Sequence, residues 1–148
     1  MNGLVYAGGE AALVAWKSAW QSYCVALARD SYQPNARQQR ITQVSEIRGL
    51  RQELVNRSVA EHGPAENFTR LYLADNVTFA VKTNEPYRWI IVFRAGKTDA
   101  DSQLITAIDM RRNVPLRGLS AHTILWCGAE RTGVVAAFSH VTSPTKGK

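Results

Sequence analysis

One short stretch of this sequence has the residue types of a phosphate-binding loop. Residues 95–98, AGKT, look like the end of such a loop, in which a glycine-rich backbone wraps the phosphates and a following helix presents its N-terminal amides. The pattern needs a glycine five residues before Gly96, and Ile91 stands there. Two carboxylates, Asp99 and Asp101, follow where phosphates would sit. We therefore interpret the stretch as a polar hairpin loop that binds no nucleotide.

A second chemistry open to this sequence is metal-independent cleavage of RNA. The reaction needs a general base and a general acid for the 2′-hydroxyl and the leaving oxygen, and cations for the charge of the phosphorane. His122 and His140 lie on adjacent predicted strands with Glu130 in the loop between them, so these three are the candidate catalytic residues. No motif supports this assignment, and a small ribonuclease is an alternative to our leading hypothesis.

Metal binding and nucleophilic hydrolysis are both disfavoured. The chain has three histidines and two cysteines, and on a regular strand His122 and Cys127 would point to opposite faces. No serine or cysteine is paired with a base by a recognisable motif. We therefore expect no metal and no cofactor, and we expect Cys24 and Cys127 to be reduced thiols.

The N-terminal residues also bear on location. Glu10 and Lys17 interrupt the first apolar run, which lacks the basic start of a signal peptide. No stretch approaches the roughly 18 apolar residues of a membrane helix. The expectation is a cytoplasmic protein without a membrane partner.

The charge of the chain points to a different class of function. Eighteen lysines and arginines against twelve acidic residues give a net charge of +6, and most of the excess lies after residue 66. Arginine strongly outnumbers lysine, and its planar fork suits phosphates and carboxylates. A positive field of this kind favours nucleic acid or an acidic protein surface as the partner.

Two groups of arginines are the candidate binding residues. The first group lies in the second half of the chain, where two members end a predicted strand and three surround an irregular link. The second group falls within about a quarter of the circumference of a predicted helix. The first group is Arg88, Arg94, Arg111, Arg112 and Arg117, and the second is Arg37, Arg40, Arg48 and Arg51.

The elements that would carry these residues are two helices followed by strands. Residues 9–29 are apolar on nearly every side, which predicts a buried helix. Pro34 breaks this pattern, Asn35 is a candidate cap, and a second helix is predicted over 36–61. After Pro64 the apolar period changes to two, and short turns separate five or six extended segments.

This order of elements predicts an α+β fold, with two N-terminal helices packed on an antiparallel meander sheet of five or six strands. In the predicted strand 87–94, Tyr87, Trp89, Ile91 and Phe93 would lie under the helices, which leaves Arg88 and Arg94 on a partly open face. We expect one domain over residues 1–141 and a disordered tail over 142–148.

Our leading hypothesis is a non-enzymatic basic binding protein that engages nucleic acid, a nucleoprotein or an acidic protein partner. An accessory or inhibitory protein of a mobile genetic element would fit the size and the charge. A second alternative, besides the ribonuclease, is a cone-shaped α+β domain that binds an apolar small ligand or dimerises through its sheet. The sequence leaves the oligomeric state open, a homodimer included.

Overall fold

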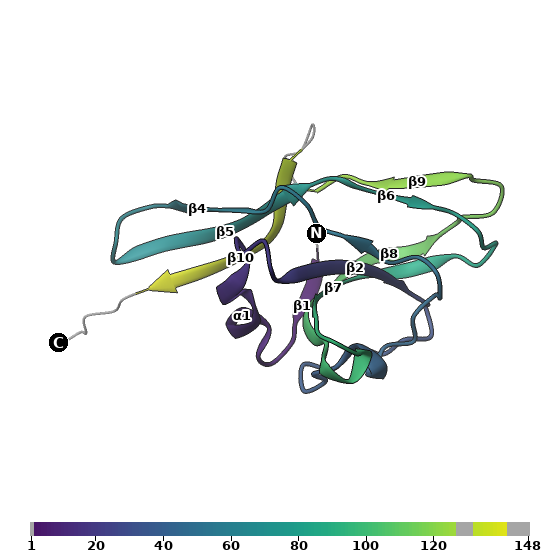
Figure 1. The fold of residues 1–148 in the computed structure, drawn as a ribbon, viewed down its shortest axis with the longest axis horizontal. Helices are drawn as coiled ribbons and strands as arrows, with labels where there is room; N and C mark the ends of the chain where they lie inside the picture. The colour runs from purple at the N-terminus through teal and green to yellow at the C-terminus, as the bar shows by residue number, and fades with distance from the viewer. Residues whose placement is uncertain (1, 127–131, 142–148) are drawn as a thin grey trace.

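The computed structural model describes residues 2–126 and 132–141, and this part of the chain consists mainly of antiparallel strands (Figure 1). Strands account for 50% of it and helices for 10%. The only helical segment near the N-terminus of the described chain spans seven residues, α1 (Gly9–Ala12) followed by the 3-10 turn η1 (Leu13–Ala15). The expected α+β fold with two long helices is therefore wrong.

The strands follow one another along the chain with a few helical turns between them. They are β1 (Asn2–Val5), β2 (Ser22–Ala28), β3 (Gln52–Glu53), β4 (Ser58–His62), β5 (Asn67–Asp75), β6 (Val77–Ala80), β7 (Tyr87–Ala95), β8 (Gln103–Val114), β9 (Ala121–Ile124) and β10 (Thr132–Val141). Two further 3-10 turns are η2 (Ile41–Gln43) and η3 (Asp99–Asp101). Within the described ranges, no helix has the length and apolar character needed to cross a bilayer.

These strands form two layers. The main sheet has five strands in the order β1-β8-β7-β2-β3. Strand β5 belongs to a three-stranded sheet, β10-β5-β4, and β6 pairs with β9. Only Asn76 separates β5 from β6, so the two smaller sheets follow each other along one run of chain. Figure 1 shows β6 and β9 beside the main sheet and the three-stranded sheet, which we call the arm, extending to the other side.

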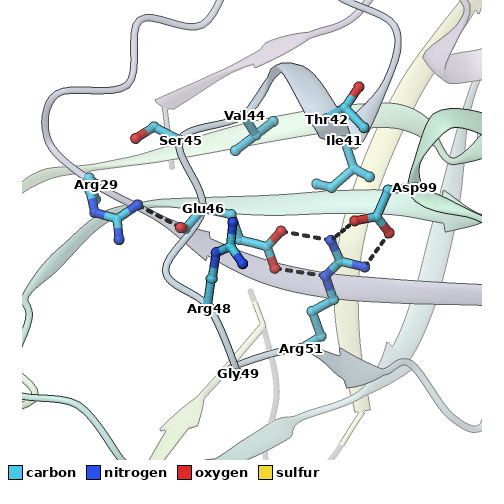
Figure 2. A pocket seen from close by; sticks show the side chains of 10 residues that line it. All are labelled: Arg29, Ile41, Thr42, Val44, Ser45, Glu46, Arg48, Gly49, Arg51 and Asp99. Atoms are coloured by element: carbon cyan, nitrogen blue, oxygen red, sulfur yellow. Dashed lines mark hydrogen bonds and ion pairs between the residues drawn. The ribbon is translucent and has the colours of Figure 1, made fainter.

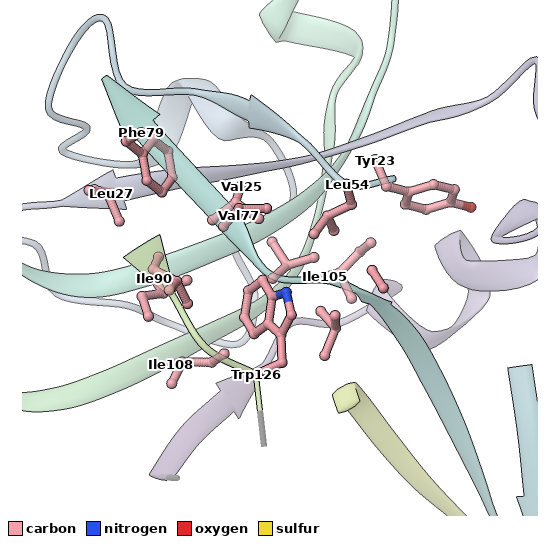
Figure 3. Close-up of a cluster of buried hydrophobic side chains, with 14 of the residues drawn as sticks. Tyr23, Val25, Leu27, Leu54, Val77, Phe79, Ile90, Ile105, Ile108 and Trp126 are labelled. Atoms are coloured by element: carbon pink, nitrogen blue, oxygen red, sulfur yellow. The ribbon is translucent and has the colours of Figure 1, made fainter. Parts of the chain in front are cut away.

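The main core lies between the main sheet and the β6–β9 layer (Figure 3). Val25 and Ile90 come from the main sheet, and Phe79 and Trp126 come from the opposite layer. All four side chains are almost completely buried. Burial of such a side chain contributes about 1.5–3 kcal/mol, so this interface between layers is what stabilises the sandwich.

The first predicted helix does not form because its second half is β2, an interior strand of the main sheet. Residues 22–28 pair with β7 on one side and with β3 on the other. Val25 and Leu27 face the main core, while Ala26 and Ala28 face a second cluster on the opposite side of the sheet. A strand buried on both faces is a continuous apolar run, which periodicity alone does not distinguish from a buried helix.

The second predicted helix does not form because two of its residues have backbone angles that an α-helix excludes. Gly49 has φ +81° and Asn56 has φ 53°, both in the left-handed region that a right-handed helix excludes. The segment instead wraps the main sheet. Ile41 packs with Ile91 and Phe93 on the face that points away from β6 and β9.

The predicted strands are confirmed in position, but their pairing is not a meander. All six extended segments after Pro64 contain a strand. Strand β5 pairs with β10 and β4, whereas β6 pairs with β9. The partly open sheet face is also a wrong expectation, because Ile90 and Val92 on that face are buried in the main core.

Candidate functional site

The two histidines of the ribonuclease alternative lie at opposite ends of one layer. His122 is opposite Phe79 on β6, and His140 is opposite Phe68 on β5. These two phenylalanines are eleven positions apart along an extended run, or roughly 35 Å of chain. The structure does not bring the two imidazoles into one site, and Glu130 lies outside the described residues.

His140 packs against an aromatic side chain of the arm. Its ring stacks on Phe68 with the centroids 5.1 Å apart. Its Nε2 atom lies 3.0 Å from Oε2 of Glu10, the acidic residue of α1. His140 therefore lies where the arm meets the segment at the start of the described chain.

His122 lies at the other end, beside the phenol of Tyr87. Tyr87 Oη and His122 Nε2 share a hydrogen bond of 2.8 Å. Burial lowers the pKa of His122, and burial raises the pKa of Tyr87 to about 12 although Arg112 opposes that rise. At neutral pH the pair is therefore an uncharged imidazole and an uncharged phenol with a cation nearby.

Arg88 and Arg51, both candidate binding residues, are held by carboxylates. Arg88 contacts Asp109 at 3.0 Å and Asp30 at 2.9 Å. Arg51 contacts Glu46 at 2.7 Å and Asp99 at 2.8 Å, and these hydrogen bonds raise its pKa. Each guanidinium is shared by two acidic groups, so neither contributes excess positive charge.

A pocket of about 580 Å³ lies on the segment that covers the outer face of the main sheet (Figure 2). Arg48 and Arg51 line it together with Arg29, while Arg37 and Arg40 do not. Arg29 forms an ion pair with Glu85 and donates to the Glu46 carbonyl oxygen. Arg48 is exposed and forms no ion pair with another described residue. The charges of this pocket are nearly balanced, so its capacity to bind an anion depends on Arg48.

The remaining arginines of the second group, Arg37 and Arg40, lie nearer the start of that segment. The Arg37 side chain is exposed, and its backbone N–H donates to Asn35 Oδ1. Arg40 donates to Gln103 Oε1 at 3.4 Å. The predicted helical row of four arginines therefore does not exist as one surface.

A bulge in β8 carries two arginines of the first group. Tyr87 pairs with Val114 and Trp89 pairs with Asp109, so the four residues 110–113 stand opposite the single residue 88. Arg111 lies in this bulge with φ 63°, and its backbone N–H donates to Asp109 Oδ1 at 2.7 Å. Positive φ is uncommon for a residue with a side chain, and bulges often redirect side chains near functional sites.

Further cations lie close to this bulge. Arg117 and Lys82 are exposed on two loops that the hydrogen bond from Val81 N to Ser120 O joins at 3.0 Å. In the described part of the chain, neither of them nor Arg112 forms an ion pair with a carboxylate. We call this region the basic end, and we define it as Lys82, Arg111, Arg112, Arg117 and His122.

Sequence reasoning missed several residues that the structure makes prominent. Arg57 donates to three carbonyl oxygens, those of Trp16, Ser18 and Gln21, and stabilises the loop after η1. Trp20 is 81% exposed although the pattern predicted it to be buried. Lys82 was not singled out, although its position beside a predicted turn was a usable signal for an exposed cation.

The loop that contains residues 95–98 and the cysteines are the other features that the sequence singled out. Residues 96–102 connect β7 to β8, where Gly96 N–H donates to Ser102 Oγ and η3 takes the place of the helix that a phosphate loop requires. Cys24 is a free thiol whose pKa burial raises to about 11, and Cys127 lies outside the described residues. Among the described residues, no three His, Cys, Asp or Glu side chains gather as metal ligands would.

The geometry defines a two-layer antiparallel β sandwich with a three-stranded arm and a basic end. No protein family model matches the chain, and no curated protein or solved structure is significantly similar to it. Function must therefore be argued from the surfaces of the protein itself.

Proposed function

We propose that this protein binds nucleic acid through the basic end, without catalysing a reaction on it. The observation that carries the proposal is the β8 bulge, which holds Arg112 next to the loops of Arg117 and Lys82. Carboxylates near the bulge are already engaged, because Asp109 holds Arg88 and Glu85 holds Arg29. The positive charge of Lys82, Arg112 and Arg117 is therefore available to a partner.

Phosphates are the ligand chemistry that this arrangement fits best. A guanidinium binds two phosphate oxygens through parallel N–H groups, and a string of such contacts fixes a backbone without reading its sequence. Each phosphate that is neutralised releases condensed counterions, which supplies most of the affinity of non-specific complexes. We infer that the basic end contacts the nucleic-acid backbone.

Binding is a better supported proposal than RNA cleavage. General acid–base cleavage needs two proton-transfer groups at one phosphate, and the two candidate histidines lie at opposite ends of the β5–β6 run. An apolar ligand enclosed between the layers has less support as well. Trp126 and Phe79 fill the space between the layers, and the pocket of about 580 Å³ has five charged residues in its wall.

A matched pair of double variants tests the proposal. Arg112→Glu with Arg117→Glu reverses two charges at the basic end, and Lys17→Glu with Lys97→Glu reverses two exposed lysines elsewhere, so the net charge changes equally. Fluorescence anisotropy with short single- and double-stranded RNA and DNA measures the affinity. We expect the first variant to lose at least about tenfold in affinity and the control to lose much less.

Two outcomes would count against the proposal. Equal losses in both variants would show that net charge, not the basic end, determines binding. No binding to any of the four probes at low salt would remove nucleic acid as the partner, and an acidic protein surface would then be the hypothesis to pursue.

A further inference from the structure

Strand β10 has one open edge. It pairs with β5 over most of its length and with no other strand of the described chain. Its ten residues, TGVVAAFSHV, contain no lysine, arginine, aspartate, glutamate or proline. An open edge presents unpaired N–H and C=O groups, and such a strand without charge or proline is a template for pairing with another strand.

The edge strands β1, β3 and β4 are protected in ways that β10 is not. Strand β3 has two residues and β1 has four. Strand β4 has five residues and includes Glu61, which forms an ion pair with Arg70. Short length and charge are the usual means by which proteins prevent edge pairing, so β10 differs from these three edges.

An apolar groove of about 330 Å³ runs beside β10. Its other wall is formed by β1 and β8, and its lining is Gly3, Leu4, Val5, Thr106, Ile108, Val134, Val135, Ala136, Ala137 and Phe138. Val5, on the rim, is 49% exposed, and Val141, at the end of β10, is 65% exposed. No side chain of the lining carries a charge, so the groove favours an uncharged, extended occupant.

We infer that the groove is the site where two copies of this chain associate, with β10 of one copy antiparallel to β10 of the other. Each chain carries a net charge of +6, so two copies repel one another over most of their surfaces. Strand β10 and the groove lining contain no lysine, arginine, aspartate or glutamate, so they allow close approach of two copies. A two-fold axis pairs the same strand with itself, so one interaction satisfies both open edges.

The C-terminal residues of the same chain are a poorer occupant of the groove. Residues 142–148, TSPTKGK, contain two lysines and a proline and no large apolar side chain. Such a segment would replace none of the apolar contacts that Val5, Ile108 and Phe138 offer.

The size of the surface sets the expected strength of the dimer. A standard interface uses about 20–30 residues from each partner. Strand β10 supplies ten residues, and β1 and β8 supply five more that line the groove. The surface is at the small end of the range, so we expect a reversible dimer with a dissociation constant on the order of micromolar.

The test is sedimentation equilibrium across a concentration series. Ala137→Lys and Ser139→Lys each put a charge on an exposed position of β10, and Ser58→Lys puts the same charge on an exposed position of the edge strand β4. We expect the first two variants to weaken dimerisation at least tenfold and the third to behave as wild type. Circular dichroism and a thermal melt establish that each variant is folded.

Three results would overturn this inference. The first is a wild-type chain that stays monomeric up to about 1 mM. The second is a dimer that persists unchanged in both β10 variants. The third is a monomer whose β10 amides become protected from hydrogen exchange only when another protein is added, which would assign the edge to that partner.

Discussion

The basic end and the arm lie at opposite ends of the β5–β6 run, and they differ in how their strands terminate. At the basic end, β8 bulges and two loops project cations beyond the sandwich. At the arm, β10 continues as a strand without lysine, arginine, aspartate or glutamate, and one of its edges pairs with no other described strand. The same layer thus separates a surface suited to polyanions from a surface suited to another strand, because charge is concentrated at one end and absent from the edge at the other.

This difference has a structural cause. The basic end is fixed by contacts of Asp109, which accepts hydrogen bonds from Arg88 and from the backbone of Arg111. The arm is fixed by aromatic packing, in which Tyr72 contacts Trp16 and Phe138. Because the two regions share no side-chain contact among these residues, their functions can be separated by mutation.

The largest expected effect comes from removing the anchor of the arm. Trp16 is 1% exposed, and its Nε1–H lies within hydrogen-bonding distance of the carbonyl oxygens of Ser58 on β4 and Leu73 on β5. We expect Trp16→Ala to lower the free energy of unfolding by about 3–5 kcal/mol. Urea denaturation followed by circular dichroism measures the change.

Trp20 is the matched control for Trp16, because it is the same residue type and is 81% exposed. Trp20→Ala should change the free energy of unfolding by no more than about 0.5 kcal/mol. Similar losses in both variants would contradict the description of how the arm is attached.

The second prediction is that the two ends act independently. Arg112→Glu with Arg117→Glu should reduce nucleic-acid affinity at least about tenfold and leave dimerisation within about twofold of wild type. Ser139→Lys should show the reverse pattern. Nucleic-acid affinity and dimerisation are measured for each variant. A variant in which both are weakened would show that dimerisation and binding are coupled.

The third prediction concerns the strained residue of the bulge. Glycine adopts positive φ without steric cost, so Arg111→Gly should raise the free energy of unfolding by about 0.5–1 kcal/mol. The same change removes a cation from the basic end and should weaken binding to nucleic acid. Denaturation and anisotropy on the same preparation measure both effects.

Asn56 provides the comparison for Arg111, because it also has positive φ but lies outside the basic end. Its side chain donates to Asp75 Oδ2 at 2.5 Å, so Asn56→Gly should relieve no net strain and should leave affinity unchanged. A loss of affinity in Asn56→Gly would show that backbone flexibility, not the guanidinium, accounts for the effect at Arg111.

The smallest expected effect is a dependence of stability on pH. Burial lowers the pKa of His122 in the folded state, so the unfolded chain takes up a proton first as the pH falls below about 6.5. The contribution of the uncharged imidazole is present above that pH and is lost as the pH falls through the folded-state pKa. Comparison of wild type with His122→Gln between pH 8 and pH 5 should show a shallower decline in the variant.

The strand half of the fold was predictable because its signals are local. Alternation from Asn67 onward and turn residues such as Pro86 and Gly96 locate the strands without knowledge of their partners. The helices were not predictable in the same way. The apolar run 22–28 becomes a strand only because β7 and β3 pair with it, and that choice is made by tertiary contacts.

The candidate site was predictable in part. Arg111, Arg112 and Arg117 were named from a cationic irregular stretch, and the structure places them at a bulge and an adjoining loop. The ion pairs of Arg88 and Arg51 depend on Asp30, Asp109, Glu46 and Asp99, which are distant in sequence or lie on a segment whose path was predicted incorrectly. Charge counting identifies available cations but does not reveal which ones the fold neutralises.

The salt dependence of nucleic-acid binding tests the central claim most directly. Lys82, Arg112 and Arg117 should each release counterions from one phosphate, which predicts a slope of about −2 to −3 for the logarithm of the association constant against the logarithm of the salt concentration. Arg112→Glu with Arg117→Glu should make the slope shallower by about 1.4–1.8. A wild-type slope near zero, or a slope that this double variant leaves unchanged, would contradict binding through the basic end.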